Sequence, residues 1–480
     1  MKQRNHRVNA LSPLLLAFAC VAESPRAWCE AIVGAETLAQ AVQIRGPAGT
    51  PLISSRRVTQ FVSVAIVERP WGRRGAVFTF RARVRIDADF GESCDPTSGR
   101  CFDEVNRSRL SEFVPLFARR SFDVPYAYAD LSGIARGVMD VRVGRIFQSD
   151  ALGFALFDGA RARLAPGIGV VLELAGGLQT RGGLPLSTGR FEPDGVIRLD
   201  RTAWTSALLP YVAPSVVAPM VAFALETSDP GPVTARIAYR RVWTDRGVAD
   251  ERIGAGVDAT VGVLRARAEA AYVPAVREVS QARIDAALRF GAGRYVGLEF
   301  ARTRPVFDFT SIWMAFWMDG TDDMRAYAEI DMSGRTALSG AAYVRRYALG
   351  DSGPSNRGID QGDLWNAGGA ASVRYRAPAW QAHVRARGEA GAVGARVGVD
   401  GDAWWWMIPD VLRVDARLSL WAIRDELRPD RGGLSFGVVL GATARLGSLA
   451  DVHLDIEDDV NPIVGQRFRA TAALNLRAPL

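Results

Sequence analysis

Hydrophobic and polar residues alternate at every second position in the segment FTFRARVRIDADF, residues 78–90. Phenylalanine, alanine, valine and isoleucine occupy one set of positions. Polar residues occupy the other set, and its charged members are Arg81, Arg83, Arg85, Asp87 and Asp89. A period of two is that of a β-strand, whose successive side chains point to opposite faces. A strand of this kind fits a soluble sheet as well as a membrane barrel, so the rest of the chain must decide.

The same alternation recurs along the chain. It is clearest in six further segments, at residues 263–273, 280–290, 324–332, 380–390, 412–420 and 467–477. No segment of comparable strength shows a helical period, and the apolar faces are mostly small aliphatic residues. Alternating segments of about ten residues joined by short turns and longer loops are typical of transmembrane β-barrels. We therefore predict an all-β, antiparallel transmembrane barrel of about 18 strands, within a range of 16 to 20. A soluble β-sandwich or propeller array is the alternative.

The N-terminus has the features of an export signal. A basic stretch, MKQRNHR, precedes a short apolar stretch and small residues. Cleavage is expected after Ala22 or after Ala31, and Ala31 is preferred. The predicted organisation is a signal peptide at 1–31, a periplasmic lead-in at 32–57 and a barrel at 58–480. The chain is therefore expected in the outer membrane of a Gram-negative cell.

The formal net charge is +7, and Lys2 is the only lysine. Because the arginines are spread along the alternating segments and form no patch or tail, binding to nucleic acid is not expected. On a barrel, the polar face lines the lumen. The lumen and selectivity candidates are Arg81, Arg83, Arg85, Arg145, Arg265, Arg267, Arg385, Arg387, Arg467 and Arg469. Interleaved carboxylates such as Glu269, Asp285 and Glu389 predict that much of this charge is paired across strands.

The sequence predicts no enzyme, cofactor or metal centre. GDSG at 350–353 matches a serine-protease motif, but His383 and His453 both follow Ser352, which is the wrong order for that family. No Cys/His spacing is typical of a metal site, and the acidic stretch at 451–462 matches no calcium loop. Cys94 and Cys101 bracket a Pro/Gly turn, and in an exported protein they are predicted to form a disulfide.

One stretch resembles a known family. The segment VRVGRIFQSDALGFALFDGARARL, residues 141–164, is similar to the "GRQ … FDG" segment of outer-membrane porins, including alginate-export-type and phosphate-selective-type porins. Gly144, Arg145, Phe157, Asp158 and Gly159 carry the match, and Ile146 replaces the glutamine. The resemblance covers one hairpin and implies a channel with charged residues near a constriction. The C-terminal RAPL departs from the aromatic ending usual in such barrels.

These features predict a passive channel for small hydrophilic solutes. Rings of charged side chains select ions in pores, and the arginine excess predicts a preference for anions. The alternative is a non-conducting barrel, blocked by segment 91–122 or 179–216, with a structural or surface-binding role. Outer-membrane lipid and lipopolysaccharide are the expected partners besides the solutes. Homotrimers are common among such pores, but no feature of the sequence decides the oligomeric state.

Overall fold

The computed structural model describes most of the chain as a single antiparallel sheet. The residues described are 30–46, 48–49, 51–71, 75–89, 92–93, 120–150, 152–179, 218–228, 231–244, 247–291, 293–304, 320–348, 363–426, 429, 432–462 and 465–479. The strands are β1 Glu30–Arg45, β2 Pro51–Trp71, β3 Ala76–Asp89, β4 Glu92–Ser93, β5 Arg120–Gly133, β6 Met139–Asp150, β7 Gly153–Leu164, β8 Val170–Gln179, β9 Pro219–Thr227, β10 Val233–Thr244, β11 Gly247–Val261, β12 Leu264–Val273, β13 Glu278–Arg289, β14 Arg294–Thr303, β15 Thr321–Asp331, β16 Thr336–Ala348, β17 Asp363–Arg376, β18 Trp380–Gly391, β19 Gly394–Ile408, β20 Leu412–Asp425, β21 Gly433–Arg445, β22 Ala450–Asn461 and β23 Gly465–Pro479.

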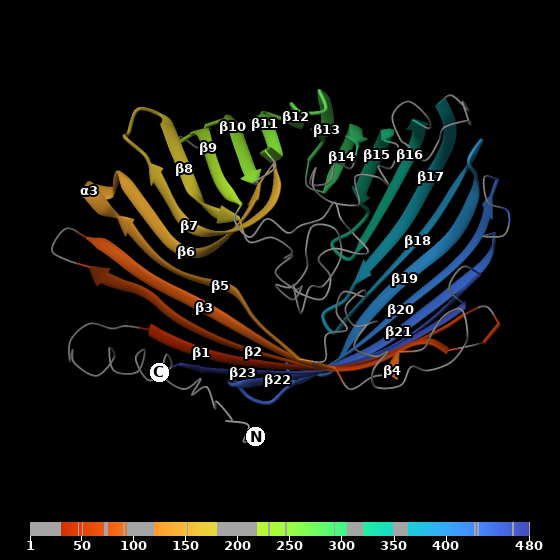
Figure 1. The fold of residues 1–480 in the computed structure, drawn as a ribbon. Coiled ribbons are helices and arrows are strands. Elements are labelled where there is room, and N and C mark those ends of the chain that lie inside the picture. Colours follow the sequence, from red (N-terminus) through yellow and green to blue (C-terminus); the bar gives the residue numbers. More distant parts are fainter. Residues whose placement is uncertain are drawn as a thin grey trace, which may run out of the picture.

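The sheet closes on itself to form a barrel. Of the 23 strands in the described residues, β4 has two residues and pairs only with the start of β2. The other 22 pair in chain order, and β1 pairs with β23 through contacts such as Glu36 with Asn475. Figure 1 shows the first strands lying beside the last ones, where the barrel closes. The element α3, Ile134–Gly137, is a single turn between β5 and β6 in which Ala135 and Arg136 have positive φ.

The predicted antiparallel all-β barrel is confirmed, but the predicted number of about 18 strands is wrong. Residues 32–57, expected to be a lead-in, lie in β1 and the first part of β2, so the barrel begins at Glu30. Alternation is weak in β1 because apolar Leu38 and Val42 share the face of Glu36. It is weak in β9, PMVAFALET, because Met220 and Ala224 on its inner face are buried against another part of the chain.

The two ends of the barrel differ. Both ends of the described chain, Glu30 and Pro479, lie at the end where every connection between strands has two to five residues. We call this the turn end. The other end, the loop end, carries the longer connections, at 90–119, 180–218, 304–320 and 349–362. Short turns at one end and longer loops at the other are typical of outer-membrane barrels, in which the short turns are periplasmic.

The concave and convex faces of the sheet follow from contacts that skip a strand. The Tyr327 hydroxyl on β15 donates to Asp285 on β13 at 2.6 Å, and Arg374 on β17 pairs with Glu329 on β15 at 3.1 Å. Side chains of next-but-one strands converge only on the inside of a curved sheet. The lumen face therefore carries Tyr327, Asp285, Arg374 and Glu329. Because residues paired across two strands share a face, the register then assigns the remaining strand residues to the lumen or to the outside.

The outward face is apolar and exposed. Large aliphatic residues on this face of seven strands are 43% to 67% exposed: Val257, Ile284, Leu298, Val384, Leu418, Leu440 and Ile456. An apolar belt this extensive on a water-soluble surface would be unusual and marks a lipid contact. Strand β3 follows the same rule, with Phe80 and Val84 facing outward and Arg81 and Arg83 facing the lumen.

The two rims of the belt have different chemistry. Aromatic side chains face outward at the turn end, where Trp71 packs near Phe78 and Tyr375 packs near Trp380, with ring centroids 5.8 and 4.9 Å apart. Trp405, from the WWW run, lies at the same level and is 49% exposed. The loop end also has outward aromatic residues, such as Trp365 and Phe436, but it differs from the turn end in carrying outward ion pairs. They include Arg241 with Glu251, and Arg302 and Arg346 with the shared Asp322.

Candidate functional site: the arginine-lined lumen

Nine of the ten predicted arginines lie on the lumen face. The strand register places all of Arg81, Arg83, Arg85, Arg265, Arg267, Arg385, Arg387, Arg467 and Arg469 there. Arg145 does not join them. It lies on the opposite face of β6 from Ile146, where its guanidinium donates to both carboxylate oxygens of Asp158 at 2.7 and 2.8 Å. Alternation alone placed nine residues. Arg145 has the parity of Val141 and Val143 on β6, which also face outward, so alternation along that strand does not support a lumen position.

Most of these arginines are neutralised by neighbouring carboxylates. Arg267 contacts Glu269 at 2.9 Å and Arg387 contacts Asp400 at 3.2 Å, and Arg83 pairs with Glu36. Arg467 and Arg469 share Glu457. The expected pairing of charge is therefore present, and it reduces the field that each arginine projects into the lumen.

Three exposed arginines keep their charge facing the lumen. Arg81, Arg265 and Arg385 have no carboxylate within 4.0 Å among the residues described here. Arg385 lies opposite Ser372 on β17 and Asp400 on β19. Arg289 and Arg417 also face the lumen without a carboxylate that near among the described residues, so all such unpaired charges contribute to any anion preference.

Arg385 borders a hollow in the lumen wall. This hollow, of about 370 Å³, lies over β14–β19 and is lined by five arginines and three carboxylates. Ser339 and Ala341 on β16 and Ala370 and Ser372 on β17 form its floor, and the two serine hydroxyls are hydrogen-bonded at 2.6 Å. Small residues in the middle of a wall of long side chains leave room for a solute.

Aromatic rings lie flat against the wall beside this hollow. A Cβ on Gly297 would lie 2.5 Å from the Tyr327 hydroxyl, and one on Gly368 would lie 2.7 Å from Cζ of Tyr343. Each ring therefore covers its cross-strand glycine, the arrangement known as aromatic rescue. Trp421 covers Gly398 in the same way and carries the Arg387 guanidinium 4.2 Å from its centroid. Flat rings leave the lumen open where upright ones would narrow it.

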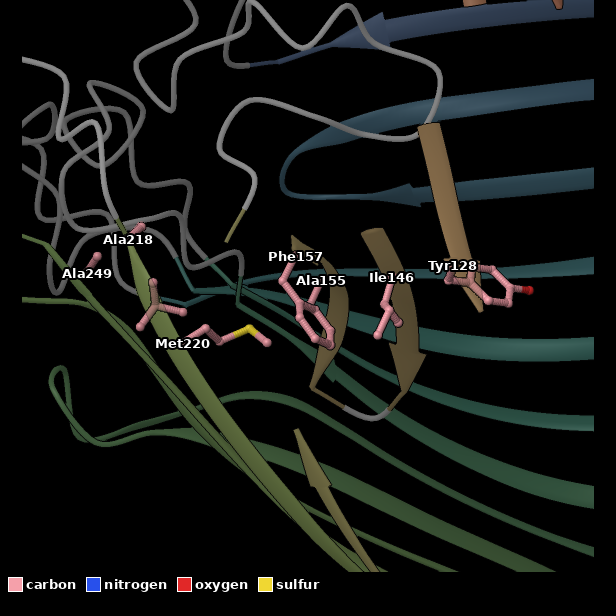
Figure 2. Packing of buried hydrophobic residues seen from close by; sticks show 8 residues of the cluster. Tyr128, Ile146, Ala155, Phe157, Ala218, Met220 and Ala249 are labelled. Atoms are coloured by element: carbon pink, nitrogen blue, oxygen red, sulfur yellow. The ribbon is translucent and has the colours of Figure 1, made fainter. Parts of the chain in front are cut away.

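The hairpin β6–β7 leaves the wall and folds into the lumen. Its inner side chains Ile146, Ala155 and Phe157 are buried against Tyr128, Met220, Val242 and Ala249. Figure 2 shows Phe157 and Ala155 on one strand and Ile146 on its neighbour, between Met220 on one side and Tyr128 on the other. At the end of the hairpin, Leu152 packs on Ala224 and Ala238 of β9 and β10. This is the largest buried apolar cluster among the described residues, and it narrows the lumen.

The residues of the porin-like segment meet in this hairpin. Gly144 pairs with Gly159, Arg145 with Asp158 and Ile146 with Phe157. Gly159 also pairs with Gly177 on β8, and a Cβ on either would lie 2.7 Å from the other's Cα. Gly144, with φ of 131°, approaches β5 as closely, since its Cβ would lie 2.8 Å from Cα of Tyr128. We call the row Gly144, Gly159 and Gly177 the glycine crease. Such close approach needs glycine and permits a sharp bend.

Both histidines of the described chain, His383 and His453, lie on the lumen face. His383 lies 3.1 Å from Asp402, and His453 lies between Thr443 at 2.9 Å and Asp455 at 2.6 Å, all on the lumen face. Cys94, Cys101 and Ser352 lie outside the described residues, as does nearly all of the two predicted plug segments. Within the described ranges, no group of three His, Cys, Asp or Glu residues is arranged to hold a metal ion. No helix in that part of the chain is long and apolar enough to cross a membrane.

Comparison with known proteins gives fold likenesses only. No family model and no curated protein matches the sequence. Similar solved structures include a BenF-like porin from Pseudomonas fluorescens Pf-5, with 8% identity and a TM-score of 0.46, covering 94% of this chain and 99% of that one. Another is OpdK of Pseudomonas aeruginosa, with 10% identity and a TM-score of 0.43, covering 94% of this chain and 99% of that one. A third is OccAB1 of Acinetobacter baumannii, with 9% identity and a TM-score of 0.44, covering 95% of this chain and 99% of that one. At this level of identity they assign no solute and no residue role to this chain.

Proposed function

We propose that this protein is an outer-membrane channel for the passive diffusion of small hydrophilic solutes, with a preference for anions. The observation that carries the proposal is the closed barrel with an exposed apolar belt outside and an arginine-rich face inside. Lipid tolerates strands only when every edge is paired, as closure between β1 and β23 ensures. A polar barrel interior is the water-filled conducting path of a porin, whereas in other outer-membrane barrels a plug fills it.

The anion preference rests on unpaired lumen arginines such as Arg81, Arg265 and Arg385. Paired charges leave short-range dipoles, but Arg81, Arg265 and Arg385 present net positive charge to the lumen. The resemblance of residues 141–164 to alginate-export-type and phosphate-selective-type porins also favours an anionic cargo. We expect the preference to be moderate because so much of the remaining charge is neutralised.

Reversal potential in a planar bilayer tests this proposal. Under a KCl gradient, the refolded protein should give steady steps and a reversal potential of anion sign. Replacing both Arg265→Gln and Arg385→Gln removes two unpaired lumen charges and should move the reversal potential toward zero or to the cation side. Arg424→Gln is the matched control, because Arg424 faces outward and pairs with Glu426 at 2.7 Å. An anion-signed potential that is unchanged in the double variant would contradict the assignment of selectivity to these residues.

A plugged, non-conducting barrel is the second candidate function, and the number of strands supports it. Barrels of about 16–18 strands leave an aqueous channel, whereas outer-membrane transporters of about 22 strands have a plugged lumen. The present barrel has 22 paired strands and a hairpin folded inside. Absence of conductance from protein that inserts and shows the gel mobility of a folded barrel would favour this candidate over the channel.

We also propose that the loop end faces the outer leaflet. The outward ion pairs of Arg241, Arg302 and Arg346 lie there, whereas the turn end carries uncharged aromatic residues. Charged groups suit the phosphate-bearing head groups of lipopolysaccharide, and aromatic girdles suit a phospholipid interface. Protease added to intact cells should therefore cut within the long connections at the loop end and leave the short turns intact.

A further inference from the structure

The end of the β6–β7 hairpin is attached to the wall only through its base. The pairing of β6 with β5 ends at Arg145, and the pairing of β7 with β8 ends at Phe157. Residues 146–156, which we call the tip, pair with each other and with no other described strand. The pairing stops beside the glycine crease. The tip is therefore a two-stranded flap joined to the wall at a bend.

Side chains of the lumen wall hold the tip by its backbone. The Arg240 guanidinium donates to the carbonyl of Leu152 at 2.9 Å and to that of Phe154 at 3.5 Å. Arg252 donates to the same Leu152 carbonyl at 3.3 Å. Both arginines contact Asp250, which fixes their positions, at 3.4 and 2.9 Å. The Leu152 side chain fills the space over Ala224 and Ala238.

Burial makes Arg240 the central member of this contact. Arg240 is 4% exposed and Asp250 is 6% exposed. A buried guanidinium needs every hydrogen bond it can make, and here the tip supplies two of its acceptors. The tip in turn has carbonyl groups that no strand satisfies, so docking satisfies both partners at once.

We propose that the tip is a hinged latch that bends at the glycine crease and sets the cross-section of the pore, and that Arg240 is the residue that positions it in the lumen. Docked on β9–β11, the tip narrows the lumen. Released, it leaves a wider opening. This inference rests on the proposed channel function for its consequence, but the docking itself is independent of conduction.

Single-channel recording of Arg240→Ala tests the latch. Loss of a buried, hydrogen-bonded charge should shift the ratio of docked to released tip by roughly a hundredfold, which appears as frequent visits to a larger conductance level. Arg241→Ala is the matched control, because Arg241 is the next residue but faces outward and pairs with Glu251. It should retain the wild-type level. Arg240→Ala channels that fold and show only the wild-type conductance would overturn the proposal.

A disulfide between the tip and the wall gives a readout that needs no conduction. Leu152→Cys with Ala238→Cys, in a background whose native cysteines are serine, should cross-link in high yield on oxidation, and its yield should fall when Arg240→Ala is added. Oxidation should also remove the larger level from that triple variant. A low yield with Arg240 intact would refute the docked latch even if the protein conducts. A high yield in a protein that never conducts would refute the channel and keep the docking.

Discussion

Single residues determine where the wall bends. Period-two alternation predicted which arginines face the lumen, because it depends only on the parity of positions along a strand. Arg145 shares the parity of Val141 and Val143, so the same rule places it on the outward face of β6. The bend at Gly144 and Gly159 depends on how closely β6, β7 and β8 approach one another, and only the paired glycines across three strands reveal it.

Gly159→Ala should disrupt this bend. The added methyl group would overlap the backbone of β8, with its Cβ 2.7 Å from Cα of Gly177. Overpacking of this kind costs about 1–3 kcal/mol, so we expect a lower midpoint of urea unfolding and a displaced tip. Gly256→Ala, on the lumen face of β11, is the control, because its Cβ would meet no atom closer than 3.8 Å. Equal stability of the two variants would show that the close approach at Gly159 is not required.

Strands and hairpins show how far the sequence could be read. Strands such as β12 and β18, with lipid on one side and water on the other, alternate cleanly and were predicted. Strands that break this rule were missed or merged. β9 is covered inside by the hairpin, so both its faces are apolar, and β1 mixes apolar residues into its lumen face. Tertiary contacts in place of water therefore hide β9 from the alternation pattern, whereas β1 lay in the segment expected to be a lead-in.

The Arg145–Asp158 ion pair lies at the base of the hairpin. It should stabilise the folded hairpin without affecting the ion selectivity of the lumen. The two side chains are 25% and 48% exposed, so a double-mutant cycle should give a coupling of only about 0.5–1 kcal/mol. Because Arg145 faces away from the lumen, Arg145→Gln should leave the reversal potential unchanged. If Arg145→Gln shifted the reversal potential as much as Arg385→Gln does, Arg145 would have to face the lumen, which would contradict the strand register.

At the scale of the whole molecule, selectivity is a property of the summed field. Twenty-two strands of the described chain surround the lumen, and many charges on its wall are paired across neighbouring strands. The net field comes from the lumen arginines that remain unpaired. Such a field reaches about one Debye length, which is about 10 Å at 0.1 M salt and 3 Å at 1 M.

The anion preference should therefore depend strongly on salt. With a fixed ratio of KCl concentrations across the bilayer, we expect a clear anion-signed reversal potential when the mean concentration is near 0.1 M, and a value close to zero when it is near 1 M. The Arg265→Gln and Arg385→Gln double variant should show a smaller change between the two conditions, because it has lost two of the unpaired charges whose field salt screens. A preference that persists at high salt would require a constriction narrow enough for ions to touch the arginines directly. In that case the docked tip of β6–β7, and not the open lumen, would determine which ions pass.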